Sequence, residues 1–460
     1  MLLRIRGEPP YSQGGAPVYD LRMHRDPIPA GEPITDGQIL RFWLPLAAMW
    51  LVMGVEQPML SAVIARLPDA KIHLAALGVA FSLALLVESP ILQMLSAATA
   101  LASNRTRYRQ LVTLMNWAAI GLTTLHLVVA IPSVFYGITA GILRVPMEVV
   151  APAHRMFLIM VPFAAAVGYR RLWQGALIRY GFTSAVSTSM YIRLVATTGL
   201  LSLPLWLPGF RVSGSTAGGI AIIGGVVFGA VAAFVLFRRN VVSKMPDNPT
   251  DTPLPWRQLA EFYLPLSATS ILLLAARPLL TFGIARSMQP LESLATWPVV
   301  QAFLFLFTSI SMSYQEAVIA LVTAEPVTRR RIRQFAQRTG IGLSLLFFIL
   351  SMSDASRLWY RYVMALPEEL VPLSVPAMFI LVPAAYFTMM KSWYRGYLVS
   401  ERKTAVVGGA SVVNLAVLGG VVVLLPLLVP VTGTVVAAIA WTTSIGIENV
   451  PLWNRARSLK

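Results

Sequence analysis

The sequence contains no cysteine and only four histidines among its 460 residues. Without cysteine the chain can form no disulfide, and it has no thiolate to bind a metal or act as a nucleophile. The histidines stand singly, and no two of them have the short spacing of a zinc motif: His24, His73, His126 and His154. We therefore predict that the protein has no metal site.

The short motifs of enzymes and nucleotide-driven pumps are missing as well. There is no GxxxxGK[ST] phosphate-binding loop, no HExxH zinc motif and no GxSxG nucleophile motif. We expect that the protein is not an enzyme and that it has no resident cofactor. The only small ions that we expect it to use are coupling ions, either H⁺ or Na⁺.

Charged residues are scarce throughout the chain. They make up 12% of the residues, whereas an average soluble domain has about 25%. Hydrophobic residues make up 56%, the mean hydropathy is +0.68, and apolar stretches of membrane-spanning length recur along the sequence. No gap between these stretches could hold a soluble domain, so the composition predicts an all-α integral membrane protein whose function lies in its membrane helices.

The apolar stretches predict about twelve transmembrane helices. Thr35 and Gln38 have the spacing of a capping box, which places the start of the first helix. Residues 1–36 are polar and proline-rich, so we predict a disordered tail, and 450–460 a second short tail. The predicted spans are 38–63, 73–101, 111–136, 154–177, 184–207, 217–237, 258–285, 293–320, 335–353, 371–397, 404–427 and 431–449.

The net charge of +17 is distributed unevenly between the two sides of the predicted membrane. Most basic residues outside the spans fall on the side of the N-terminus, with dense clusters at 105–109 and 329–338. The positive-inside rule then places both termini in the cytoplasm, and a bacterial inner membrane suits the short tails. We expect anionic lipids to contact this face, we expect no nucleic-acid partner, and we expect a monomer.

The chain repeats itself after about 220 residues. The segment Arg41-Phe42-Trp43-Leu44-Pro45-Leu46 matches Glu261-Phe262-Tyr263-Leu264-Pro265-Leu266, and Ile64-Ala65-Arg66 matches Ile284-Ala285-Arg286. Each repeat has six spans, an even number, so both repeats insert with the same orientation. We predict two parallel six-helix lobes, 37–237 and 257–449, joined by a flexible cytoplasmic linker at 238–256.

These features resemble the MATE/MOP flippase superfamily of secondary transporters, and within it the progressive-ankylosis family. The resemblance is carried by Arg41-Phe42 with Pro45-Leu46, by Glu56-Gln57, by Gly78 with Phe81, by Arg277-Pro278 and by Trp297-Pro298-Val299. It implies two lobes that alternate access to a central site. It also implies export of small polyvalent anions such as citrate, pyrophosphate or nucleotides, although this chain lacks a long acidic C-terminal tail.

Charged residues inside the spans are the candidate site residues, because a charge in the membrane is costly unless it has a partner or a function. Glu56 and Gln57 precede Pro58 in the first span, and the repeat places Gln57 opposite Arg277 at equal depth. We predict that Arg277 and Gln57 bind substrate and that Glu56 couples an ion or closes a gate. The alternative for Glu56 is a salt bridge between the lobes.

Two further charges lie in the fifth and second spans. Arg193 is near the middle of the fifth span, and its repeat-mate is Asn414. We predict that both contact the anion. The alternative for Arg193 is a structural ion pair inside its own lobe, for which Glu88 is a candidate partner. Glu88 precedes Ser89-Pro90 in the second span and is a candidate proton carrier.

A last set of candidates lies at repeat-related positions near the inner ends of the fourth and tenth spans. Arg170 and Gln174 are four residues apart, as are Lys391 and Arg395, so each pair shares one helix face. We predict that the two faces gather an anion at an inward-open mouth. The alternative is that their long side chains reach the lipid headgroups.

The sequence thus favours a secondary transporter that exports a small polyvalent anion. A proton- or sodium-coupled multidrug exporter is an alternative, although arginines in the cleft would repel cationic drugs. A flippase for an anionic lipid-linked precursor is another, and a basic cleft suits it equally.

Overall fold

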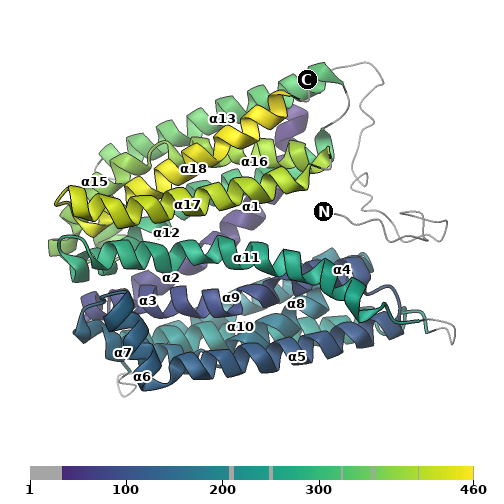
Figure 1. The fold of residues 1–460 in the computed structure, drawn as a ribbon, viewed down its shortest axis with the longest axis horizontal. Coiled ribbons are helices and arrows are strands. Elements are labelled where there is room, and N and C mark those ends of the chain that lie inside the picture. Colours follow the sequence, from purple (N-terminus) through teal and green to yellow (C-terminus); the bar gives the residue numbers. More distant parts are fainter. Residues whose placement is uncertain are drawn as a thin grey trace.

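The computed structural model describes residues 34–206, 212–247, 252–322, 325–353, 356, 358–401 and 403–458. These residues form a bundle of helices in two groups (Figure 1). In chain order the helices are α1 (Asp36–Gly54), α2 (Glu56–Ile64), α3 (Ala70–Glu88), η1 (Ser89–Gln93), α4 (Met94–Leu101), α5 (Arg105–Ala130), α6 (Pro132–Tyr136), η2 (Gly137–Ile142), α7 (Met147–Ile159), α8 (Phe163–Arg179), α9 (Thr183–Trp206), α10 (Gly214–Asn240), α11 (Trp256–Ala285), α12 (Pro290–Leu321), α13 (Pro326–Met352), η3 (Trp359–Val363), η4 (Glu368–Leu370), α15 (Val371–Leu381), α16 (Ala384–Ser400), α17 (Thr404–Leu428) and α18 (Gly433–Arg457).

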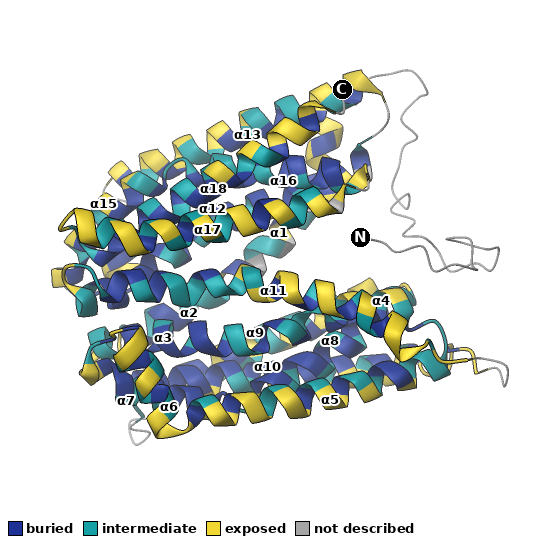
Figure 2. Ribbon diagram, viewed as in Figure 1, coloured by how far each residue is buried: buried dark blue, intermediate teal, exposed yellow. Residues whose placement is uncertain are grey.

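The protein is a multi-pass membrane protein. Among the described residues, eight helices are long and apolar enough to span a bilayer, and ten are if two bent pairs each count as one span. The α1–α2 pair and α9 occupy the other two predicted spans. The outward faces of α5 and α17 are exposed along much of their length (Figure 2) and carry large apolar side chains. Such a surface suits contact with lipid rather than water.

The two lobes repeat each other in backbone detail. Left-handed residues stand at matched positions, Asp69 with Gln289 and Arg144 with Ala365. The π-helices η2 and η3 are also repeat-mates. The α7–α8 pair bends by 44° and the α15–α16 pair by 41°, each at a matched proline. The predicted pair of parallel six-helix lobes is therefore confirmed.

In each lobe, the first half of the first span packs against the other lobe. α1 packs against α12 and α13, and its Trp43 side chain lies at T-shaped angles to Tyr314 and Phe335. The first half of α11 packs in turn against η1, where the Tyr263 hydroxyl donates to the Pro90 carbonyl at 2.9 Å. This exchange ties the lobes together near the end of the molecule where α1 begins and α18 ends, which we call the terminal end.

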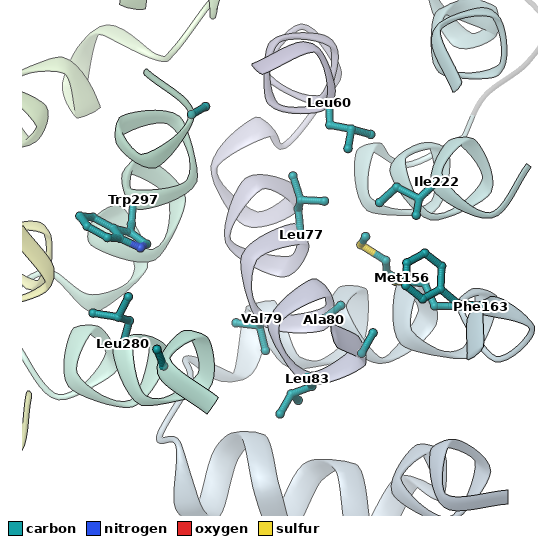
Figure 3. Packing of buried hydrophobic residues seen from close by; sticks show 14 of the residues in the cluster. Leu60, Leu77, Val79, Ala80, Leu83, Met156, Phe163, Ile222, Leu280 and Trp297 are labelled. Atoms are coloured by element: carbon teal, nitrogen blue, oxygen red, sulfur yellow. The ribbon is translucent and has the colours of Figure 1, made fainter. Parts of the chain in front are cut away.

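α3 forms much of the contact between the lobes at the opposite end, which we call the distal end. Figure 3 shows Leu77 and Val79 of this helix between two sets of side chains, Met156 and Ile222 from the first lobe and Trp297 from the second. Gly78 permits the close approach, because a Cβ atom there would lie 3.2 Å from the Pro298 ring.

Several predicted boundaries differ from the structure. α13 begins at Pro326, so the basic cluster at 329–338 lies on a helix rather than in a loop. α18 continues to Arg457, past the predicted end of the last span at 449. The predicted capping box is present, since Thr35 and Gln38 each accept the other's backbone N–H. Residues 1–33 of the predicted tail lie outside the described residues.

The described parts of the linker are attached to the first lobe instead of being loose. The Gln110 side chain exchanges two hydrogen bonds with the backbone of Leu254. Arg105 donates its backbone N–H to the Pro246 carbonyl and forms a 2.9 Å ion pair with Asp247. α11 therefore starts from a fixed position on the first lobe.

Candidate functional site

A pocket lies between the lobes where α2, α3, α11 and α12 meet. Its wall includes Gln57 and Arg277, the two residues that the repeat places opposite each other. Its wall also carries aromatic and polar side chains among apolar ones: Phe81, Ser82, Thr281, Trp297 and Gln301. The pocket thus combines one cation, two amides and two hydroxyl groups with aromatic surface.

Arg277 is the charged residue of this pocket. It is half-buried, and its guanidinium lies 5.7 Å from the centre of the Phe81 ring. It has no ion pair and no side-chain hydrogen bond with any other described residue. A guanidinium offers five N–H donors, and leaving them unused in a protein interior is costly. Arg277 is therefore available to an anion that enters the pocket.

A break in the first span brings Gln57 to the pocket. α1 ends at Gly54 and α2 begins at Glu56. Pro58 has no N–H to donate to the Gly54 carbonyl, and its ring crowds that carbonyl, so it favours the break. Its repeat-mate Pro278 lies inside the single helix α11. The two matched prolines therefore differ in effect: the helix is broken next to Pro58 but continues through Pro278.

Glu56 forms an ion pair within the first lobe. Its two carboxylate oxygens accept from one terminal nitrogen of Arg193 at 2.5 and 2.7 Å, and both side chains are mostly buried. Glu56 therefore does not bridge the lobes, and that predicted alternative is wrong. Arg193 does form an ion pair inside its lobe, as its predicted alternative states, but the partner is Glu56 and not Glu88.

Arg170 lies next to this ion pair. Both Arg170 and Arg193 pack against Gly229 of α10, where a Cβ atom would be 3.5 Å from Arg170 Cδ and 2.9 Å from Arg193 Cβ. Arg170 is 3% exposed, and one of its terminal nitrogens donates to the Met190 sulfur at 3.0 Å. Its Nε atom is buried and has no partner among the described residues. This cluster therefore holds two arginines for one carboxylate.

Gln174 is also buried inside the first lobe. Its amide donates to the Ser189 hydroxyl at 2.9 Å, and the residue is 1% exposed. Gln174 and Arg170 therefore do not form a basic face at an open mouth, nor do they reach toward the lipid headgroups. Both predicted interpretations of this pair are wrong, because α9 and α10 cover the helix face on which they lie.

The repeat-related residues of the second lobe converge on a buried glutamate. Arg395 binds the Glu448 carboxylate at 2.5 Å and donates to the Ser411 hydroxyl at 2.6 Å, while Lys391 lies 3.4 Å from Glu448. The Glu448 side chain is 2% exposed. This cluster also has two cations for one carboxylate. Asn414 is half-buried on α17, and its side chain joins none of the hydrogen bonds among the described residues.

Glu88 forms a separate buried pair with a histidine. Its carboxylate lies 3.8 Å from Nδ1 of His126, and the two side chains are 1% and 0% exposed. His126 stacks on Phe157, and its Nε2 lies 2.9 Å from the carbonyl oxygen of that residue. Neither carboxylate oxygen of Glu88 has a hydrogen-bond partner among the described residues.

Sequence reasoning missed three features of these sites. Glu448 is not among the predicted site residues, although a lone carboxylate in the last apolar span indicates a buried partner or a function. Gln301 lies one helical turn after Trp297-Pro298, on the face that this motif presents to the pocket. His126 gave no signal, because its partner Glu88 lies on a different span. Among the described residues there is no group of side chains that could hold a metal ion.

No protein-family model matches this chain, and no curated protein matches it in sequence. Solved structures do match. A multidrug resistance MATE family transporter of the MOP superfamily, in its inward-facing conformation, has a TM-score of 0.60 and 13% identity, over 93% of this chain and 95% of that chain. The lipid II flippase MurJ, inward closed, has a TM-score of 0.66 and 13% identity, over 90% and 87%.

A MOP superfamily transporter from Pyrococcus furiosus, described as having a binding pocket of reversed polarity, has a TM-score of 0.62 and 14% identity, over 92% of this chain and 95% of that chain. These similarities confirm the MATE/MOP fold that the sequence predicted. The finer resemblance to the progressive-ankylosis family stays a prediction.

Proposed function

We propose that this protein is a secondary transporter that exports a small polyvalent anion by alternating access of its two lobes. The observation that carries the proposal is Arg277, a cation in the pocket between the lobes that has no counter-ion among the described residues. A carboxylate or phosphate would supply the charge and the hydrogen-bond acceptors that its guanidinium lacks.

The clusters inside the lobes support the same substrate class. Each holds two cations and a single carboxylate, Glu56 in the first lobe and Glu448 in the second. Buried excess charge is unfavourable without a compensating ion. Together with Arg277 it gives the interior a positive potential, which attracts anions and repels cationic drugs. This is the argument against the cation-coupled multidrug exporter.

The orientation and the coupling of transport are part of the proposal. We place both termini in the cytoplasm of a bacterial cell, because the basic clusters at 105–109 and 329–338 lie at the terminal end. Anionic lipids would contact these clusters. A coupling proton or sodium ion would bind at Glu56 or Glu88, the two carboxylates that the first lobe places inside its spans.

A flippase for an anionic lipid-linked precursor is the second candidate. The specific observation in its favour is the similarity to the MurJ fold, with a TM-score of 0.66. Both candidates need a basic site between the lobes, and they differ in the size and lipid attachment of the substrate.

The test is efflux from proteoliposomes that are loaded with labelled citrate, pyrophosphate or ATP, with a cationic dye in parallel. We expect release of at least one anion by the wild type and its loss in Arg277→Gln. The matched control is Arg257→Gln, which neutralises an exposed arginine at the start of the same helix. Release of the dye alone would contradict the proposal, and so would unchanged anion release by Arg277→Gln. If neither anion nor dye moved, the flippase would become the leading candidate.

A further inference from the structure

The distal turns of the two lobes have the same backbone structure. In the first lobe η2 ends with Leu143 N–H bonded to the Ile138 carbonyl and Val145 N–H bonded to the Thr139 carbonyl. The second lobe repeats both bonds after η3, from Met364 to Trp359 and from Leu366 to Tyr360. A left-handed residue follows each helix, Arg144 or Ala365. Each turn leaves its last helical carbonyls pointing outward without a partner in their own helix.

An arginine from the opposite lobe binds each of these turns. Arg66, at the end of the first span, donates to the carbonyls of Tyr362 and Val363 at 2.6 and 3.0 Å. Arg286, at the end of α11, donates to the carbonyls of Ile142 and Leu143 at 2.7 and 3.4 Å. Arg66 and Arg286 occupy matched positions of the repeat.

The chemistry explains why arginine occupies both positions. A guanidinium is a planar fork that can bind two adjacent carbonyls at once, and the C-terminal end of a helix carries partial negative charge that favours a cation. Arg286 is further held in place by the ring of Phe282, whose centre lies 3.5 Å from its guanidinium carbon. Each contact is therefore a specific site for one side chain.

We infer that Arg66 and Arg286 are two symmetric latches that hold the distal end of the transporter closed. The inference rests on the proposed alternating-access function, because an opening of the distal end would have to separate the lobes and break all four bonds. Lys71 adds a third contact between the lobes at this end, an ion pair with Glu292 at 2.7 Å. The distal end would then open only when the terminal end has closed, because new contacts at the terminal end must offset the loss of the latch contacts.

The test measures the distance between the lobes directly and needs no substrate. The chain has no cysteine, so spin labels can be placed without background at Met147→Cys and Leu428→Cys. These residues are 64% and 76% exposed at the distal ends of α7 and α17. Double electron–electron resonance would then report the distal distance distribution in lipid.

In the wild type we expect a population with short distances. In Arg66→Gln/Arg286→Gln we expect a longer-distance population, with an open-to-closed ratio at least about tenfold higher. Each single variant should give a smaller rise. The matched control is Arg144→Gln, which removes an exposed charge from the same turn but no bond to the other lobe.

A distance distribution in the double variant that equals that of the wild type would overturn the inference, and so would an equal rise in Arg144→Gln. If the double variant does not fold, the single variants carry the same comparison. Arg66→Lys and Arg286→Lys separate charge from geometry, because lysine keeps the charge but cannot bind two carbonyls as a fork. We expect them to open the distal end as well. A wild type that moves no anion but whose distances respond as expected would count against the proposed function alone.

Discussion

The charged residues of the spans are arranged in two kinds of site. Glu56 with Arg193, and Glu448 with Lys391 and Arg395, are satisfied at least in part by the protein's own ion pairs. Arg277 has no such partner among the described residues. The first kind holds a lobe together, and the second kind is open to a ligand. These two roles lead to different expectations for substitutions.

Glu56 and Arg193 should be coupled energetically. In Glu56→Gln the mostly buried arginine loses its counter-ion, so we expect the free energy of unfolding to fall by about 1–3 kcal/mol. Arg193→Met should restore part of the loss in the double variant, because no unpaired charge is then left. Thermal unfolding of the two single variants and the double variant in detergent measures this coupling. Strictly additive losses would contradict the ion pair.

The two cations of the second lobe should contribute unequally. Arg395 lies 2.5 Å from Glu448 and also donates to Ser411, whereas Lys391 lies 3.4 Å from the same carboxylate. We therefore expect Arg395→Met to lower the melting temperature more than Lys391→Met does. The two variants are compared in the same thermal unfolding assay. A larger loss in Lys391→Met would contradict the prediction, because it would mean that the closer contacts of Arg395 stabilise the lobe less than the Lys391 contact does.

The repeat allowed part of the candidate site to be predicted from the sequence. Because Gln57 and Arg277 occupy matched positions, their meeting between the lobes followed from symmetry alone. The partners of Glu56 and Arg395 did not follow, since each pair joins two spans whose relative rotation the sequence does not give. An exact repeat would give both lobes the same pairing, but the carboxylate comes from α2 in one lobe and from α18 in the other.

At the scale of the elements, glycines determine how closely helices approach. The spacing of Gly225 and Gly229 predicts close helix contact, and α10 does pack tightly against α9. A Cβ atom at Gly225 would overlap the Thr197 hydroxyl, whose O–H donates to the Arg193 carbonyl oxygen. This contact therefore also sets the position of Arg193.

We expect Gly225→Ala to destabilise the first lobe, by about 1–3 kcal/mol for an overpacked core. Thr197→Ala should rescue part of this loss, because it removes the hydroxyl oxygen that the new methyl group would overlap, while the Cβ of residue 197 and the Arg193 carbonyl oxygen remain near it. Gly121→Ala is the control, since a Cβ atom there has no neighbour within 4 Å. Thermal unfolding of these variants checks the prediction. A failure of Thr197→Ala to rescue would mean that the helices move apart instead.

The positions of most helices were predictable, but their interruptions were less so. Long apolar runs are a strong signal, because every span must satisfy its backbone hydrogen bonds internally. The structure interrupts several runs: α1 and α2 separate after Gly54, and η1 separates α3 from α4. Pro58 favours the break in the first span, but proline alone does not decide where a span is interrupted, since α11 continues through the matched Pro278.

The exchange of helix halves between the lobes is a property of the whole molecule. Hydropathy and the internal repeat predicted two six-helix lobes, but they did not predict that α1 packs into the second lobe and the first half of α11 against the first. Such contacts depend on side chains far apart in the sequence, such as Trp43 with Ser313. The lobes are therefore held together by more than the linker.

This exchange predicts that the molecule survives a cut in its linker. Residues 248–251 lie outside the described residues, between the parts of the linker that contact the first lobe. We expect the co-expressed fragments 1–249 and 250–460 to purify together in mild detergent, because α1 of one fragment lies in the core of the other. A tag on one fragment and gel analysis of its partner provide the measurement.

Trp43→Ala should weaken the association of the two fragments. Trp43 donates its indole N–H to Ser313 at 2.8 Å, and its ring centroid lies 5.5 Å from that of Tyr314 and 5.8 Å from that of Phe335. Loss of a buried tryptophan costs about 3–5 kcal/mol, which is enough to lower the recovery of the partner fragment severalfold. Trp206→Ala is the control, because Trp206 is 79% exposed. Fragments that separate without any substitution, or an equal loss in Trp206→Ala, would mean that the linker and not the exchanged helices joins the lobes.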